Sequence, residues 1–159
     1  MTFKTADLCD DFSNELTVCK QAFTSYGKKI AFSGPISTVN VLEDNVLVEE
    51  SLETIPEGNI LVVDGGASRN CALMGDRLAG IMVKRNLAGV IINGCIRDSA
   101  DIAQMDAGVV ALGTNPLKSK KEGKGEKDIT VTFGEVNWKP GNYAYADEDG
   151  IVISEKKLI

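Results

Sequence analysis

Apolar residues recur at helical spacing in short segments of the chain. Leu8, Phe12 and Leu16 lie four residues apart, which predicts a helix in the first twenty-odd residues with Thr5 available as its N-cap. Three further short helices are predicted at residues 45–54, 76–85 and 101–105.

Strand-like patterns fill most of the remaining chain. Residues 60–64 form an almost wholly apolar run, typical of a strand buried on both faces, and residues 88–93 form a second run that ends at Gly94. The other predicted strands, separated by glycine, proline and aspartate turn signals, are 29–32, 36–42, 109–112, 129–136, 143–146 and 151–154. The polar, lysine-rich residues 118–127 are predicted to form a mobile, solvated loop.

The strand at 60–64, the helix at 76–85 and the strand at 88–93 together predict a βαβ unit. Such units contain parallel strands joined by a right-handed crossover. With 159 residues, the chain has the length of one domain that buries a sizeable core. We therefore expect a single α/β domain over residues 1–159, with several strands around one βαβ core.

Composition and charge narrow the classes of partner. The net charge of −6 argues against a general affinity for the nucleic-acid backbone, so no direct nucleic-acid partner is expected. The longest apolar runs are strand-sized, so no membrane segment is predicted, and no apolar signal stretch follows the N-terminus. A cytoplasmic location is the resulting expectation.

The sequence contains no histidine. This absence excludes Ser-His-Asp and Cys-His triads and zinc sites built on imidazole, so any metal must be held by oxygen ligands, as magnesium, manganese and calcium are. Cys9, Cys19, Cys71 and Cys95 form no CxxC pair and are interpreted as buried small hydrophobic residues, although a catalytic thiol at Cys71 or Cys95 stays open.

Two polar clusters follow the predicted βαβ elements. One, residues 75–78, opens the predicted helix, and the other, residues 94–98, follows the second strand. In open α/β sheets, ligands lie beyond the carboxyl ends of the strands, where helix N-termini also point. The two clusters are therefore expected to face one pocket.

The residue types in these clusters fit a 2-keto acid and a divalent cation. The guanidinium of Arg97 can bind a carboxylate in bidentate fashion, and Asp98 offers an oxygen ligand to a hard cation. Asp76 and Asp101 could bind the cation through water or activate a water. A bound cation would stabilise an enolate, the intermediate of both retro-aldol cleavage and β-keto acid decarboxylation.

Each of these residues also has a simpler structural interpretation. Taken alone, Asp76 is best interpreted as an N-cap or first-turn acid, and Asp101 as an N-cap. Arg97 and Asp98 could pair with surface partners. The residue types alone leave these alternatives open.

Several motifs resemble the RraA-like family over nearly the whole chain. They lie at residues 5–10, 32–35, 62–66, 71–76, 94–98, 141–147 and 149–151. The family includes regulators that bind and inhibit ribonuclease E, and class II 4-hydroxy-4-methyl-2-oxoglutarate aldolases, which resemble oxaloacetate decarboxylases. Its catalytic members carry Asp, twenty intervening residues and Arg-Asp, which Asp76, Arg97 and Asp98 match.

The resemblance implies a role for each position of the site. The implied catalytic residues are Asp76, which would orient a water on the metal, and Arg97, which would hold the substrate carboxylate. The implied substrate cradle consists of Gly75, Asp76, Arg77, Leu78 and Arg97. Asp98 would bind the metal directly, and Asp101 fits an acidic position that could reach it through water.

The resemblance also implies a function and an assembly. The expected activity is a lyase dependent on Mg²⁺ or Mn²⁺ that cleaves 4-hydroxy-4-methyl-2-oxoglutarate to two pyruvates, with a secondary oxaloacetate decarboxylase activity. The alternative is a non-catalytic inhibitor of ribonuclease E. The implied fold is a β-rich α/β sandwich of the swivelling-domain type in a ring-shaped homotrimer. Longer aldolases of the family add an acidic residue beyond the position of Ile159, so a reduced aldolase activity, or decarboxylation alone, is compatible with this chain.

Overall fold

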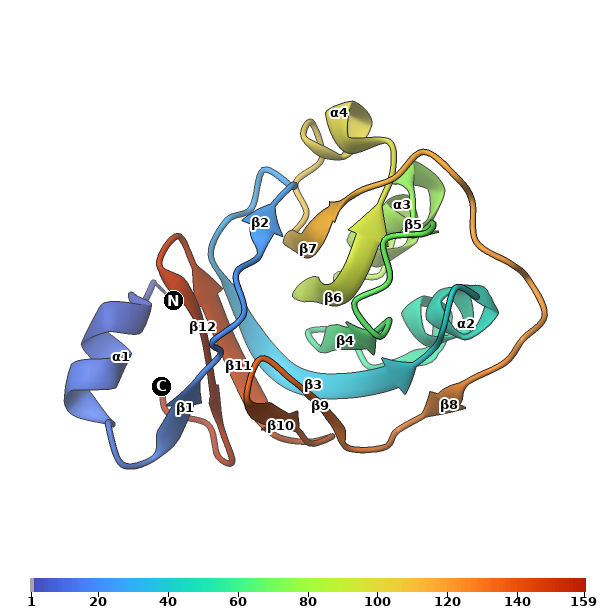
Figure 1. Ribbon diagram of the computed structural model, residues 1–159. Helices are drawn as coiled ribbons and strands as arrows, with labels where there is room; N and C mark the ends of the chain where they lie inside the picture. The colour runs from blue at the N-terminus through green and yellow to red at the C-terminus, as the bar shows by residue number, and fades with distance from the viewer. Residues whose placement is uncertain (1) are drawn as a thin grey trace.

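The computed structural model describes residues 2–159, which form one ten-stranded mixed sheet, a separate two-stranded hairpin and four helices (Figure 1). The helices are α1 (Thr5–Asp11), α2 (Val46–Thr54), α3 (Asp76–Lys84) and α4 (Ser99–Ile102). The strands are β1 (Leu16–Val18), β2 (Thr24–Ser25), β3 (Phe32–Asn40), β4 (Ile60–Asp64), β5 (Ala72–Met74), β6 (Gly89–Ile96), β7 (Val109–Thr114), β8 (Glu126–Lys127), β9 (Val131–Phe133), β10 (Val136–Trp138), β11 (Tyr143–Asp147) and β12 (Gly150–Ser154). No helix among these residues is long and apolar enough to cross a membrane.

The sheet has a parallel half and an antiparallel half. Its strand order is β1-β12-β11-β3-β4-β6-β7-β2, with β3, β4, β6 and β7 parallel and the remaining neighbours antiparallel, while β5 pairs with β6 and β8 pairs with β3. The predicted βαβ unit is confirmed, because β4 and β6 are parallel neighbours joined through α3. The α/β class is confirmed with it.

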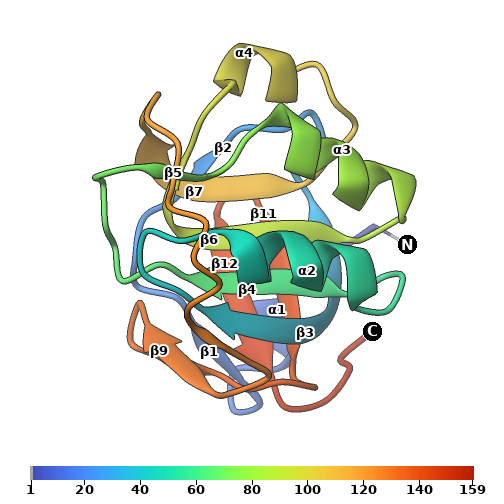
Figure 2. The same cartoon turned by 90° about the vertical axis from the view of Figure 1, so that its right-hand side faces the viewer.

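Strand β4 shows why this part of the chain is apolar on both faces. Leu61 and Val63 pack in the core beneath α2 and α3, whereas Ile60 and Val62 pack in the core shared with the antiparallel strands and the hairpin. Figure 2 shows α2 and α3 lying across one face of the parallel strands. Each such fully buried side chain contributes roughly 1.5–3 kcal/mol, so both layers hold the strand in place.

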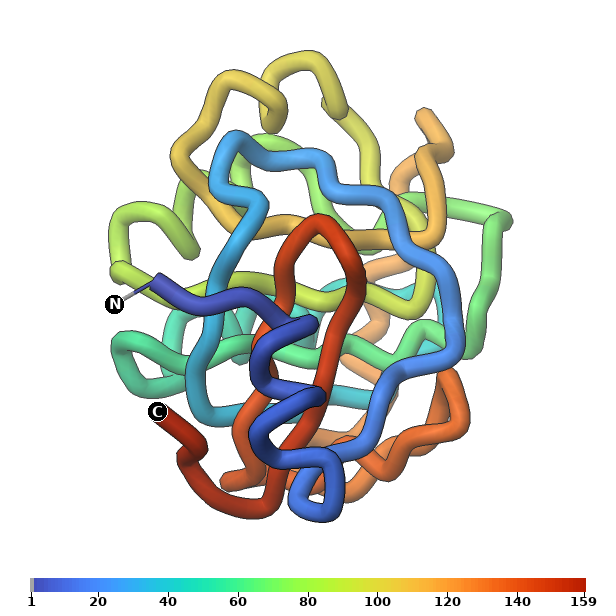
Figure 3. The backbone as a smooth tube through the Cα atoms, turned by 90° about the vertical axis from the view of Figure 1, so that its left-hand side faces the viewer, coloured from blue at the N-terminus to red at the C-terminus, as the bar shows by residue number. Residues whose placement is uncertain are grey.

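Helix α1 packs against the outer face of β11 and β12, and both chain ends lie on this side (Figure 3). The predicted helix is shorter than expected, because Leu16 belongs to β1, and the cap residue is Lys4 rather than Thr5. Thr5 instead donates its backbone N–H and its hydroxyl to the two carboxylate oxygens of Asp147, at 2.7 and 2.6 Å. A carboxylate at the end of β11 therefore binds the free amide end of the helix.

The predicted turn at residues 33–35 is wrong, because β3 runs through it without interruption. A Cβ on Gly34 would lie 2.3 Å from the carbonyl oxygen of Gly58, so glycine here permits a close approach of two backbones. Pairing with β4 begins only at Ile36, so the missing N–H of Pro35 leaves that parallel ladder intact.

The single strand predicted at 129–136 is a hairpin of β9 and β10. The chain turns at Gly134 and Glu135, whose φ angles are 63° and 60°, as the central residues of a type I′ turn require. Trp138 stacks on Phe133 across the hairpin with ring centroids 4.7 Å apart. The Gly-Glu pair lacks the asparagine or aspartate that usually signals this turn, so the sequence pattern did not show it.

Candidate active site

The end of β6 and the start of α3 meet through a strand that the pattern did not predict. Strand β5 pairs in parallel with the last residues of β6, and the backbone N–H of Arg97 donates to the carbonyl oxygen of Met74 at 2.9 Å. The predicted end of the second strand at Gly94 is wrong, since β6 continues to Ile96. This extension places the two predicted clusters side by side.

Gly75 and Asp98 are in direct contact across this junction. The Oδ2 atom of Asp98 accepts the backbone N–H of Asp76 at 3.0 Å. A Cβ on Gly75 would lie 2.5 Å from the same oxygen, so only glycine leaves room for the carboxylate. Asp98 itself has a left-handed backbone, with φ 60° and ψ 38°, a conformation costly for most residues and often found at functional sites.

Arg97 and Asp98 line two adjoining hollows. The first, of about 80 Å³, is lined by Gly75, Asp76, Arg77 and Leu78 at the start of α3. The second, of about 290 Å³, lies toward residues 114–116. None of the four ion pairs among residues 2–159 involves Asp76, Arg97 or Asp98, so the simpler interpretation of Arg97 and Asp98 as ion-paired surface residues is not realised.

The start of α3 supplies backbone amides to the first hollow. Gly75 is the cap residue and Asp76 lies in the first turn, so Asp76 is a first-turn acid rather than an N-cap. The guanidinium of Arg77 is engaged by Glu49 of α2 at 2.6 Å, which holds the pKa of Glu49 below its usual range, and Leu78 is buried in the core. Arg77 and Leu78 therefore offer backbone N–H groups rather than side chains to an anion.

Asp101 stands apart from the other predicted residues. Helix α4 begins at Ser99 with Asp98 as its cap residue, so the interpretation of Asp101 as an N-cap is wrong. Asp101 is exposed in the first turn of α4 and lines neither hollow.

The donor set suits a weakly chelated hard cation. Among residues 2–159, no three His, Cys, Asp or Glu side chains lie together as a ready-made metal cage. Asp98 offers one exposed carboxylate, with Oδ2 already fixed by an amide. Mg²⁺ is commonly held in this way, by one or two carboxylates with waters and substrate oxygens completing its shell. The residues present fit such an ion.

Asn45, Lys118, Ser119 and Lys121 also line the first hollow, and the sequence pattern missed all four. The lysines were expected to be solvated, and nothing in the spacing of a polar segment shows which of its lysines turns toward a pocket. Their placement depends on contacts with residues more than 40 positions away in the chain, such as the bond from Lys121 Nζ to Asn45 Oδ1 at 3.1 Å.

The thiol alternative is disfavoured by the surroundings of Cys71. Cys71 and Cys95 are buried, as predicted, whereas Cys9 and Cys19 are half-buried. Burial raises the pKa of the Cys71 thiol, and the nearby carboxylate of Glu43 raises it further. A nucleophilic cysteine needs the opposite environment.

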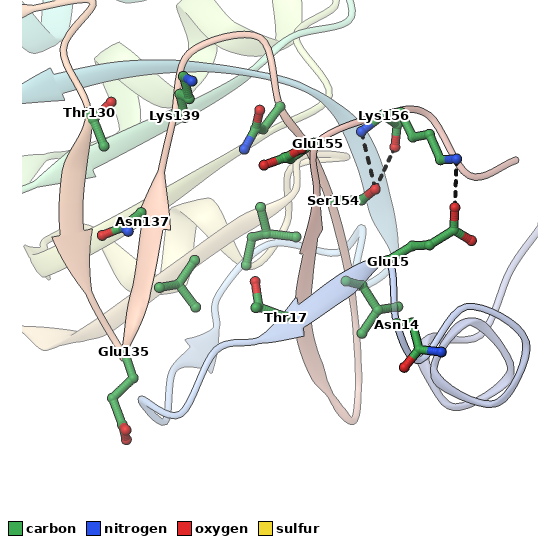
Figure 4. Close-up of a pocket in the computed structure, with 14 residues that line it drawn as sticks. Asn14, Glu15, Thr17, Thr130, Glu135, Asn137, Lys139, Ser154, Glu155 and Lys156 are labelled. Carbon is green, nitrogen blue, oxygen red and sulfur yellow. Dashed lines mark hydrogen bonds and ion pairs between the residues drawn. The ribbon is translucent and has the colours of Figure 1, made fainter.

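A larger open depression of about 1090 Å³ lies between β1, β12 and β10 (Figure 4). None of the predicted site residues lines it. Glu15 and Lys156 at its rim bind each other at 2.6 Å, and the Ser154 hydroxyl is engaged by the backbone of Lys156. None of the residues predicted to bind a substrate or a metal lines this depression, so the junction of β6 and α3 is the better candidate for chemistry.

The fold and the site together define an α/β protein with an anion- and cation-compatible pocket at the carboxyl ends of its parallel strands. The family model described as RraA-like, Aldolase/RraA, matches residues 5–153. The chain belongs to the RraA-like family.

Two relatives of similar length carry the same name. The chain is 58% identical over 156 residues to a Bacillus cereus protein named "Putative 4-hydroxy-4-methyl-2-oxoglutarate aldolase", covering 98% of each chain. An Aromatoleum aromaticum protein of the same name is 54% identical, with full coverage of both chains.

Solved structures agree closely with the fold. The Thermus thermophilis RNA-processing inhibitor RraA superimposes with a TM-score of 0.95 at 36% identity, covering 100% of this chain and 96% of that one. A Geobacillus kaustophilus structure described as S-adenosylmethionine: 2-dimethylmenaquinone methyltransferase gives a TM-score of 0.97 at 63% identity, covering 98% and 97%. Proteins with this fold are therefore known under three different names, and the function has to be inferred from the residues of the site.

Proposed function

We propose that the protein is a divalent-metal-dependent lyase that cleaves 4-hydroxy-4-methyl-2-oxoglutarate to two pyruvates and also decarboxylates oxaloacetate. The observation that carries the proposal is the contact between Asp98 and the amide-bearing start of α3, beside the half-buried Arg97. The name shared by close relatives supports the substrate. Both reactions proceed through the enolate of pyruvate.

The side chains and backbone amides of the site have separate roles in binding the substrate and in transferring protons. Arg97 and the amides at the start of α3 bind the carboxylate next to the keto group and orient the substrate. Asp76, exposed and outside every ion pair among residues 2–159, accepts the proton of the 4-hydroxyl, directly or through a water, as the C3–C4 bond breaks. It then returns a proton to C3 of the enolate, which yields the second pyruvate.

Asp98 is the residue that would hold the cation, with Asp101 as a more distant contributor through water. A bound Mg²⁺ or Mn²⁺ supplies positive charge that stabilises the enolate. Oxaloacetate fits the same groups, since loss of its distal carboxylate as carbon dioxide leaves the same enolate.

The test is the release of pyruvate from both substrates with Mg²⁺ or Mn²⁺, and then with EDTA. We expect metal-dependent release that is lost in Asp98→Asn. Asparagine tolerates the left-handed backbone and keeps an oxygen acceptor for the Asp76 amide, so this variant removes the charge while retaining the fold. Full turnover in Asp98→Asn, or in EDTA, would sink the proposal.

A second candidate is the inhibition of ribonuclease E, which the likeness to an RNA-processing inhibitor supports. Such a role needs a protein surface rather than an intact pocket. In a ribonuclease E cleavage assay, wild type and Asp98→Asn would then inhibit equally. If neither protein inhibits the cleavage, this candidate function is excluded, and the proposed lyase activity is not affected by that result.

We further propose a homotrimer as the assembly. Leu42 and Leu117 are 68% and 61% exposed, and an interface that covered them would remove their apolar surface from water. Light scattering coupled to gel filtration measures the mass directly, and a monomer mass of 17.0 kDa would contradict this assembly.

A further inference from the structure

Residues 118–124, which we name the strap, pass outside α2 on the way from β7 to β8 (Figure 1). The strap is bonded on both sides. Next to it, the N–H of Ala72 in β5 donates to the carbonyl oxygen of Leu117 at 2.8 Å, and the N–H of Asn45 donates to that of Lys120 at 3.2 Å. The segment predicted as a mobile loop is thus held between β5 and the turn before α2.

The buried carboxylate of Asp44 anchors the strap. Asp44 is only 2% exposed. Its oxygens accept the backbone N–H groups of Glu122, Gly123 and Lys124 at 2.8, 3.3 and 3.4 Å, and that of Val46 at 3.1 Å. Successive amides of this kind form a nest for an anion. Burial alone would raise the pKa of Asp44, but the four amide bonds lower it, so the carboxylate stays charged.

The anchored strap turns two lysines toward the candidate active site. Lys118 and Lys121 line the same hollow as Arg97. Lys121 is held by Asn45, whose own amide donates to the carbonyl oxygen of Leu73 in the segment leading to Gly75, at 3.3 Å. Arg77 also lines this hollow, although Glu49 engages its guanidinium. Four cationic residues thus outnumber the two carboxylates of the lining, those of Asp76 and Asp98, which is a local excess of positive charge in a chain of net charge −6.

When Arg97 and the α3 amides bind the carboxylate next to the keto group, the two lysines remain available for a second anionic group of the substrate. We propose that Lys118 and Lys121, held in place by Asp44 through the strap, bind the second carboxylate of a dicarboxylic keto acid and select it over monocarboxylic analogues. This inference rests on the proposed function and adds to it the residues that determine substrate class. Asp44 is a positioning residue, because it touches the strap rather than the substrate.

The experiment measures binding rather than turnover. Calorimetric titration with Mg²⁺ present compares 2-oxoglutarate with 2-oxovalerate, which has the same five-carbon chain but no second carboxylate. We expect wild type to bind 2-oxoglutarate more tightly than 2-oxovalerate. In the double variant Lys118→Met/Lys121→Met, the ratio of the two dissociation constants should fall by roughly tenfold, as expected when ion pairs at a partly exposed site are lost. Lys124→Met is the matched control, because Lys124 lies on the same strap but does not line the pocket.

Asp44→Asn tests the positioning role. It should weaken 2-oxoglutarate binding as the double lysine variant does, while 2-oxovalerate binding stays near wild type. A merely structural role would weaken both ligands equally, which would overturn the role of Asp44. If Asp44→Asn fails to fold, the lysine variants still carry the test.

The outcomes separate this inference from the proposed function. Binding of both keto acids with an unchanged preference in the double lysine variant would overturn the inference alone. Failure of wild type to bind either keto acid would overturn the proposed function and the inference with it.

Discussion

Replacing Gly75 by alanine tests whether the position of Asp98 governs activity. The added Cβ would lie 2.5 Å from Asp98 Oδ2 and 3.4 Å from Arg97 Cγ. Because the nearest atom ends a side chain, we expect the carboxylate to swing away while the backbone stays in place. The bond from the Asp76 amide, now 3.0 Å long, is then lost.

The expected effect on stability is small and the effect on activity is large. A hydrogen bond to a charged group contributes about 1.5–3 kcal/mol, and the exposure of Asp98 reduces this to about 1 kcal/mol. For a domain of this size, that loss lowers Tm by roughly 2–4 °C. A displacement of about 1 Å in a positioned catalytic group costs on the order of 100-fold in rate, so kcat/KM for pyruvate release should fall by about that factor.

Gly80→Ala is the matched control, because it lies in the same helix and its added Cβ meets no atom within 4 Å. It should retain full activity and raise Tm by a few degrees, since alanine favours a helix interior by about 1 kcal/mol over glycine. The double variant Gly75→Ala/Asp98→Ala should be no less active than Asp98→Ala alone. Wild-type kcat/KM in Gly75→Ala would refute the reasoning.

Three further predictions concern stability. Gly89→Ala places a Cβ 2.3 Å from the ring of Phe32, so urea unfolding should show a loss of about 1–3 kcal/mol that Phe32→Leu partly restores; additive losses would contradict this contact. Burial raises the pKa of Asp147, but the hydrogen bonds that it accepts, chiefly from Thr5, together outweigh this effect, so the pKa is lowered. The charged carboxylate therefore stabilises the fold at pH values above its unfolded pKa of about 3.9, and this stabilisation is lost as the pH falls through the lowered pKa. Wild type should therefore exceed Asp147→Asn in unfolding free energy near neutral pH, with the gap closing below about pH 4; a gap independent of pH would exclude this charge effect. Gly134→Ala forces alanine to a φ of 63° and should lower Tm by several degrees, whereas an unchanged Tm would contradict the type I′ turn.

The elements predicted well from the sequence are those whose pattern reflects local burial. Strand β4 has the predicted bounds, and α2 and α3 differ from prediction by one residue at one end. In each case the apolar residues face cores formed by immediate structural neighbours. The pairing of Arg97 and Asp98 with the start of α3 followed from the same βαβ geometry.

The parts that could not be predicted depend on contacts between distant segments. Strand β5 has only three residues, too few for a period, and exists because β6 extends past Gly94 to pair with it. The strap lysines reach the pocket because Asp44, about 80 residues away in the chain, binds the strap amides. No local pattern carries such information.

The spacing between Asp76 and Arg97 is itself a consequence of the fold. Helix α3 descends for nine residues, about 14 Å at 1.5 Å per residue, and β6 returns for eight residues beside β4. Because the helix runs antiparallel to the strands it joins, its first turn lies beside the end of the strand that follows. The spacing by itself therefore indicates no more than a βαβ unit of this size. The chemistry depends on the residue types at the start of α3 and at the end of β6. Relatives named as aldolase, inhibitor and methyltransferase share the fold, so comparing Asp98→Asn with wild type in the lyase and ribonuclease E assays separates a function that uses this junction from one that only shares its scaffold.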